Sequence, residues 1–128
     1  MIVLDTHIWI WWVNGSNQLT ADQERELNAE ERIGVSTISC WEVAKLVEKG
    51  RLELDRPVLE WLTRALRYPG VELVALSPEI AADSAALPGE FHRDPADQIL
   101  VATARVLGCR LVTSDRKILD YEHVQTLA

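Results

Sequence analysis

Residues 94–115 read DPADQILVATARVLGCRLVTSD, and this stretch joins one helical pattern to one strand pattern. Asp94 is a favoured N-cap residue, a proline follows it at the first helical position, and Gly108 suits the end of a helix. We therefore predict a helix between Asp94 and Gly108. The short apolar run at 111–113 predicts a buried strand, and Asp115 follows it after one small residue. A helix that leads into a buried strand is typical of an α/β protein.

The rest of the chain alternates in the same way between short apolar runs and longer segments with helical spacing. Strands are predicted at residues 2–4, 33–35 and 71–76, with a last edge strand at Val124. Helices are predicted at residues 7–13, 21–29, 37–49, 57–67 and 78–87, with a helical turn at 116–119. This alternation predicts an α/β fold in which helices flank a central, mostly parallel sheet. The length predicts a single domain over residues 1–128.

The composition argues against several classes of protein. The 128 residues include 13 Lys and Arg and 20 Asp and Glu, which gives a net charge of −7. An acidic surface disfavours sequence-blind binding to a nucleic-acid duplex, which depends on basic side chains. The apolar stretch at 1–13 contains Asp5 and His7 and has no basic segment, so we expect a cytoplasmic protein without a signal peptide or membrane span. Cys40 and Cys109 lack metal-binding spacing and are expected to be buried thiols.

Four acidic side chains share positions where α/β proteins bind ligands. Asp5 directly follows the first strand and Asp115 follows a later one, at the carboxyl ends of the sheet. Glu42 and Asp97 lie near the starts of two helices, where the partial positive charge favours a carboxylate. A converging group of ionised carboxylates repels itself unless a cation joins it, and hard oxygen ligands suit Mg²⁺ or Mn²⁺. These four residues therefore predict a divalent metal site.

Each of these acids also has a purely structural explanation. Ser39 and Glu42 have the spacing of a capping box, and Asp94 and Asp97 resemble one with Asp in place of Glu. The other two acids have the positions of a cap for a helical turn and of a residue that holds a β–α loop. A shared metal site and four separate structural roles both stay open at this point.

Several neutral side chains accompany the acids. Thr6, Ser36 and Ser39 could donate hydrogen bonds to a phosphate or to metal-bound carboxylates, or could serve as helix caps. The five tryptophans lie on predicted helices with apolar neighbours, which favours core or subunit contacts over base stacking. Because a helix of seven residues cannot bury every face, we expect Trp11 or Trp12 to be exposed.

The motifs taken together resemble a known family. The stretches MIVLDTHIWIWW, VSTISCWEVAKLVEKGRLEL, HRDPADQILVATARVLG and LVTSD are similar, in order and spacing, to the successive motifs of PIN-domain nucleases of the VapC toxin type. The resemblance covers nearly the whole chain and implies a PIN-like fold. In that family the acids at the matching positions bind divalent metal, and here these positions are Asp5, Glu42, Asp97 and Asp115, with Asp94 as a further neighbour. The chain departs from the family pattern at Ala96 and Gln98, where an apolar lid and a basic residue are usual.

The resemblance also implies a function. It implies an endoribonuclease that depends on Mg²⁺ or Mn²⁺ and is the toxin of a type II toxin–antitoxin system, in which metal-activated water cleaves RNA and leaves a 5′-phosphate. It implies a homodimer and a VapB-like antitoxin whose C-terminal segment lies over the active site. Two alternatives stay open. One is a non-catalytic PIN-fold binding domain, and the other is a different carboxylate-metal phosphohydrolase, although Asp5 has no second Asp two residues further on.

Overall fold

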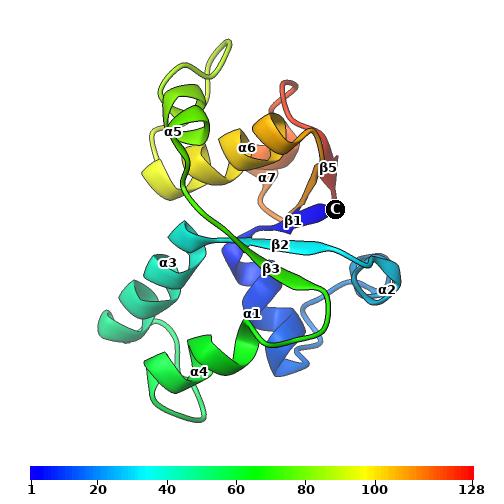
Figure 1. The fold of residues 1–128 in the computed structure, drawn as a ribbon, viewed down its shortest axis with the longest axis vertical. Helices are drawn as coiled ribbons and strands as arrows, with labels where there is room; N and C mark the ends of the chain where they lie inside the picture. The colour runs from blue at the N-terminus through cyan, green and yellow to red at the C-terminus, as the bar shows by residue number, and fades with distance from the viewer.

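A five-stranded parallel sheet forms the centre of the protein in a computed structural model that describes all 128 residues (Figure 1). The strands are β1 (Ile2–Leu4), β2 (Ile33–Ser36), β3 (Val71–Val74), β4 (Arg110–Val112) and β5 (Thr126–Leu127). Their order across the sheet is β3-β2-β1-β4-β5, and every neighbouring pair is parallel. The predicted α/β fold with a central parallel sheet is confirmed.

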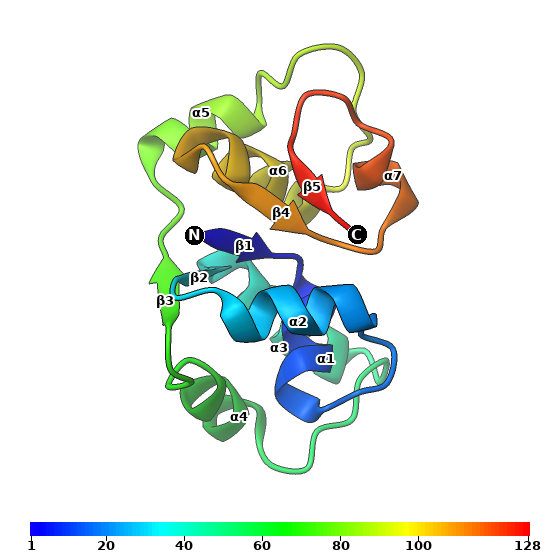
Figure 2. The same cartoon turned by 90° about the vertical axis from the view of Figure 1, so that its right-hand side faces the viewer.

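Seven helices cover the two faces of the sheet. They are α1 (Thr6–Asn14), α2 (Ala21–Ala29), α3 (Thr37–Glu48), α4 (Val58–Ala65), α5 (Pro78–Ser84), α6 (Pro95–Leu107) and α7 (Arg116–Leu119). Helices α1 to α4 lie on one face and α5 to α7 on the other (Figure 1, Figure 2). Parallel strands need such crossovers, because the chain must return to the same end of the sheet before each new strand. None of the helices combines the length and apolar character needed to cross a membrane.

Alternating side chains of the strands supply a core on each face. Ile2 and Leu4 of β1 belong to the core that α1 to α4 cover, whereas Val3 belongs to the core beside α6 and α7. Trp9 of α1 fills the first core and Leu100 of α6 fills the second. Each such buried side chain contributes about 1.5–3 kcal/mol relative to an exposed one. Burial on both faces explains why these strands are continuous apolar runs in the sequence.

The last strand begins later than predicted, and the prediction at Val124 is wrong. The backbone N–H of Leu111 donates to the carbonyl of Gln125 at 2.8 Å, and that of Thr113 donates to the carbonyl of Leu127 at 3.0 Å. Pairing with β4 therefore starts after Val124, which contacts the second core from the preceding loop.

Two predictions about single side chains are also wrong. The most exposed tryptophan is Trp41 on α3, which is 54% exposed, whereas Trp11 and Trp12 are half-buried against the first core. Helices α2 and α4 cover the outer side of α1, because Trp12 contacts Asn28 of α2 and the ring of Tyr68 just beyond α4. The two cysteines are free thiols that are half-buried and not fully buried.

Candidate functional site

The strand order creates a distinct point at one end of the sheet. The order reverses at β1, since β2 and β3 follow it on one side while β4 and β5 lie on the other. In open α/β sheets, ligands bind beyond the carboxyl ends of the strands where the order reverses. Asp5 directly follows β1, and Asp115 lies just beyond β4. The fold therefore brings these two acids to the expected ligand-binding point.

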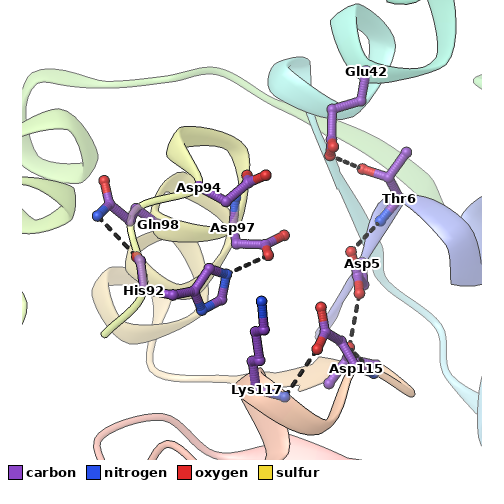
Figure 3. A network of polar contacts seen from close by, with 10 residues as sticks. Asp5, Thr6, Glu42, His92, Asp94, Asp97, Gln98, Asp115 and Lys117 are labelled. Carbon is purple, nitrogen blue, oxygen red and sulfur yellow. Dashed lines mark hydrogen bonds and ion pairs between the residues drawn. The ribbon is translucent and has the colours of Figure 1, made fainter. Parts of the chain in front are cut away.

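Five acidic side chains line one cavity at this point (Figure 3). The cavity has a volume of about 350 Å³. Its acidic residues are Asp5, Glu42, Asp94, Asp97 and Asp115. The structure thus brings together all four acids predicted as metal ligands, with Asp94 beside them, from separate segments of the chain.

Asp5 is the most deeply buried acid of the cavity, at 7% exposed. Its Oδ1 accepts a hydrogen bond from the Thr6 backbone N–H at 2.8 Å, and its Oδ2 accepts one from the Thr113 hydroxyl at 2.7 Å. The Thr113 hydroxyl in turn accepts from the backbone N–H of Asp115 at 3.0 Å. Burial raises the pKa of Asp5, although both hydrogen bonds oppose the rise. One threonine therefore links Asp5 to the loop that carries Asp115.

Glu42 projects from α3 and is connected to the first turn of α1. The Thr6 hydroxyl donates to Glu42 Oε1 at 2.5 Å and lies 2.8 Å from the Ser39 hydroxyl. The capping box considered for Ser39 and Glu42 does not form, because Ser36 is the N-cap of α3 and accepts from the backbone N–H two residues further on. Glu42 is therefore free of a capping role and turns its carboxylate toward the cavity (Figure 3).

Asp97 lies in the first turn of α6, and its carboxylate binds a histidine. His92 Nε2 lies 2.6 Å from Asp97 Oδ2. Asp94 caps the helix by accepting from the Asp97 backbone N–H at 3.0 Å, so only this half of the predicted capping box is present. Gln98, which stands where the family usually has a basic residue, donates to the carbonyl of His92 at 3.1 Å. These bonds hold the Asp97 carboxylate at the edge of the cavity.

The carboxyl groups of the cavity share an excess of negative charge. Burial raises the pKa of Glu42 to about 7 and that of Asp97 to about 6. The neighbouring Asp5 carboxylate adds to both increases, because like charges disfavour ionisation. Hydrogen bonds from Thr6 to Glu42 and from His92 to Asp97 oppose these increases. Perturbed carboxyls gathered in one cavity are typical of functional sites.

Asp115 is held by the helix that follows it and, indirectly, by α2. Its Oδ1 accepts from the Lys117 backbone N–H at 2.9 Å, so it is also the N-cap of α7. The side chain of Lys117 points into the space between His92 and Asp115 (Figure 3). Ser114 accepts a hydrogen bond at 2.9 Å from Gln23, a fully buried side chain of α2. Helix α2 thus supports the loop on which Asp115 lies.

The donor set of the cavity fits a divalent cation. Its acids offer hard oxygen atoms, and burial and like charge raise the pKa of three of the carboxyls. No three His, Cys, Asp or Glu side chains converge closely enough to surround an ion, since hydrogen bonds draw Asp5, Glu42 and Asp97 toward different partners. Mg²⁺ is usually held by one or two carboxylates and keeps several waters, so a cavity lined with carboxylates suits it.

Two of the three neutral residues expected beside the acids belong to a hydrogen-bonded chain that ends on an acid of the cavity, and the third does not. Thr6 and Ser39 form a hydrogen-bonded chain to Glu42, whereas Ser36 is a helix cap that does not line the cavity. Thr113 was missed, although it contacts Asp5 directly. The sequence signal for it is slight, a hydroxyl at the end of a buried apolar strand and two residues before an acid.

Comparisons with known proteins agree with this geometry. The family model for the PIN domain matches residues 2–124. Ribonuclease VapC22 of Mycobacterium tuberculosis is 36% identical over 122 residues, which cover 95% of this chain and 92% of that protein.

Two solved structures with low sequence identity share the fold. The VapBC2 complex of Rickettsia felis, bound to a DNA fragment, has a TM-score of 0.74 at 18% identity and covers 99% of this chain and 98% of that chain. FitAcB of Neisseria gonorrhoeae has a TM-score of 0.69 at 21% identity and covers 100% of this chain and 97% of that chain. On the family model and the 36% identical relative, the chain belongs to the PIN domain family and is one of its VapC-type members.

Proposed function

We propose that this protein is a divalent-metal-dependent endoribonuclease and the toxin component of a toxin–antitoxin pair. The observation that carries the proposal is the cavity of five acids at the point where the strand order reverses. The similarity to Ribonuclease VapC22 supports RNA as the substrate. The excess negative charge supports Mg²⁺ or Mn²⁺ as the cofactor.

The acids of the cavity have different tasks in this proposal. Asp5 and Asp97 lie on opposite sides of the cavity (Figure 3) and are the core ligands, while Glu42 and Asp115 complete the site directly or through water. A divalent ion held by these acids would supply a water nucleophile at neutral pH and would offset the charge that develops on the phosphate. Thr113 fixes the orientation of Asp5, and hydrolysis by water leaves a 5′-phosphate on the product.

The same charge suggests how an antitoxin would block the site. A guanidinium pairs with carboxylates through two hydrogen bonds and would relieve the repulsion among them, as a metal ion does. We therefore propose that a VapB-like antitoxin inserts an Arg or Lys near Asp5, Glu42 and Asp97. A similar fold in a toxin–antitoxin complex from Klebsiella pneumoniae, with a TM-score of 0.70, supports a partner of this kind. The homodimer stays a prediction.

A metal titration followed by a nuclease assay tests the catalytic proposal. Purified protein is incubated with structured and single-stranded RNA at increasing Mn²⁺ or Mg²⁺, and the ends of the products are analysed. We expect metal-dependent cleavage that leaves 5′-phosphates and is lost in Asp5→Asn and Asp97→Asn. The control Glu53→Gln removes an exposed charge outside the cavity and should cleave like the wild type. Full cleavage by both folded Asp variants, or cleavage unaffected by EDTA, would refute the proposal.

A further inference from the structure

A groove adjoins the acidic cavity along one side of α3. It has a volume of about 430 Å³ and shares Glu42 and Asp94 with the cavity. Because the two hollows have these lining residues in common, a ligand that occupies the cavity can continue into the groove. The small side chain of Ala96, at the start of α6, also lines the groove.

Three basic side chains line the groove beside the two acids that it shares with the cavity, although the protein as a whole is acidic. Lys45 of α3, Lys49 at the C-cap of this helix and Arg51 beyond it line the groove, in a chain with a net charge of −7. Lys45 lies 3.2 Å from Glu48, whereas Lys49 and Arg51 form no ion pair. Both of these unpaired side chains are exposed. Two positive charges are therefore available to an anionic ligand that extends from the cavity.

The exposed ring of Trp41 lies in the same groove. Trp41 and Lys45 are four residues apart on one face of α3, and the C-cap residue Lys49 continues the same spacing. Lys45 Nζ lies over the Trp41 ring at 5.9 Å from its centroid, so a cation and an exposed aromatic ring are neighbours in the groove. Single-stranded nucleic acid binds to this combination, because its phosphates contact cations while its bases stack on aromatic rings.

We propose that this groove binds the single-stranded segment of RNA next to the bond that is cleaved, with Lys49 and Arg51 on its phosphates and a base on Trp41. This inference rests on the proposed ribonuclease function, since it assigns the substrate path of the same site. Glu42 and Lys49 are about 10 Å apart along the axis of α3. A ligand that contacts both residues must therefore be longer than one phosphate group. The acidic cavity, once a cation is bound, receives the scissile phosphate, and the groove receives the flanking strand.

Binding of RNA without cleavage tests this groove. The affinity of a fluorescein-labelled single-stranded RNA is measured by anisotropy in EDTA at several salt concentrations. For Lys49→Ala/Arg51→Ala, the slope of log affinity against log salt should fall by about 1.4, or about 0.7 for each lost phosphate contact. The matched control Arg64→Ala/Arg67→Ala removes two charges outside the groove and should keep the wild-type slope and affinity. Circular dichroism and melting confirm that each variant is folded.

The aromatic contact has its own signature. Trp41→Ala should weaken binding by about 5- to 140-fold, the range for one base stack, and should leave the salt slope unchanged. Trp41→Phe keeps an aromatic ring and should recover most of the affinity.

Two results would overturn the proposed role of the groove in RNA binding. One is equal affinity and slope for the Lys49/Arg51 and Arg64/Arg67 variants. The other is a changed oligomeric state of Trp41→Ala without a change in RNA affinity, which would assign the face to contact between two copies of the chain. Failure of the wild type to cleave RNA would overturn the catalytic proposal instead, and the binding result would still stand because the assay contains no metal.

Discussion

The hydroxyl of Thr113 joins two acids of the cavity from distant parts of the sequence. It donates to Asp5 Oδ2, 108 residues away, and accepts from the backbone N–H of Asp115. The side chain is fully buried, so water cannot replace either partner. The position of Asp5 relative to Asp115 therefore depends on a residue that carries no charge and needs no contact with substrate.

Replacing this hydroxyl by a methyl group should destabilise the protein. Thr113→Val keeps the volume but leaves an oxygen of Asp5 and a backbone N–H unpaired, which should lower the free energy of unfolding by about 1–3 kcal/mol. Thr113→Ser keeps both hydrogen bonds and should lose only about 1 kcal/mol, for one buried methyl group. Urea denaturation of the three proteins checks the order, and a Val variant as stable as the wild type would contradict it.

The entry of the chain into β3 depends on Gly70. This residue has φ +84°, and a Cβ there would lie 2.7 Å from the carbonyl oxygen of Glu31. Its own carbonyl accepts from the Ile33 N–H at 2.8 Å and begins the pairing of β2 with the edge strand β3. A side chain at this position would therefore disturb both the turn and the strand pair.

Comparison with a second glycine separates the cost of the left-handed backbone conformation from the cost of the clash. Gly108 has φ +66°, and a Cβ added there would have no other atom within 4 Å, so Gly108→Ala should cost only the left-handed conformation, about 1–2 kcal/mol. Gly70→Ala should cost more, because the clash adds about 1–3 kcal/mol. Thermal melts of both variants measure the difference. Equal losses would mean that the Glu31 backbone moves aside freely.

The helices differ in how far local sequence determines them. Helix α6 has the predicted cap at Asp94 and the predicted end at Gly108, because both signals lie within a few residues of the helix. The start of α3 was harder, since Ser36 and Ser39 both offer a hydroxyl for capping. Strand β2 runs directly into the helix, so Ser36 takes the cap. The end of a paired strand therefore decides which serine caps α3, and the local sequence pattern does not.

The candidate site was predictable only in part for a similar reason. Acids beyond strands and at helix starts can be recognised in the sequence, and the parallel sheet brings them to one end. The hydrogen bonds of Thr113 and Gln23 connect distant segments, so no local pattern indicates them. The exposure of Trp41 was missed because it depends on which helix faces α2 and α4 cover. Burial of this kind is decided by the packing of the whole fold.

The acidic cavity makes the stability of the whole protein depend on pH. Burial raises the pKa of Asp5, of Glu42 to about 7 and of Asp97 to about 6, so the folded metal-free protein binds more protons than the unfolded chain. For Glu42 and Asp97 the contribution to stability then falls as pH rises from about 4 to about 7, and it is lost above their folded pKa values. Carboxyls whose pKa is lowered in the folded protein, such as Glu72, change stability only at pH values below their ordinary pKa. They therefore do not affect this pH window.

We therefore expect the melting temperature of the metal-free protein to fall between about pH 5 and pH 8. Glu42→Gln should flatten this dependence and raise the melting temperature at the upper end by a few degrees, or on the order of 1 kcal/mol after solvent screening. Glu53→Gln removes the same charge from an exposed position and should keep the wild-type profile. A melting temperature that rises across this range would contradict the expected charge balance.

Calorimetric titration of Mn²⁺ into the metal-free protein tests most directly whether the acids form one metal site. A pH of about 8 lies above the pKa of Glu42, about 7, and that of Asp97, about 6, so these two carboxyls are ionised before the metal is added. We predict that the wild type and Glu53→Gln bind Mn²⁺ with equal affinity, and that binding by folded Asp5→Asn and Asp97→Asn is at least about tenfold weaker, as expected when a ligand is lost. Equal Mn²⁺ affinity in all four proteins, or no Mn²⁺ binding by the wild type, would contradict a metal site built from these carboxylates.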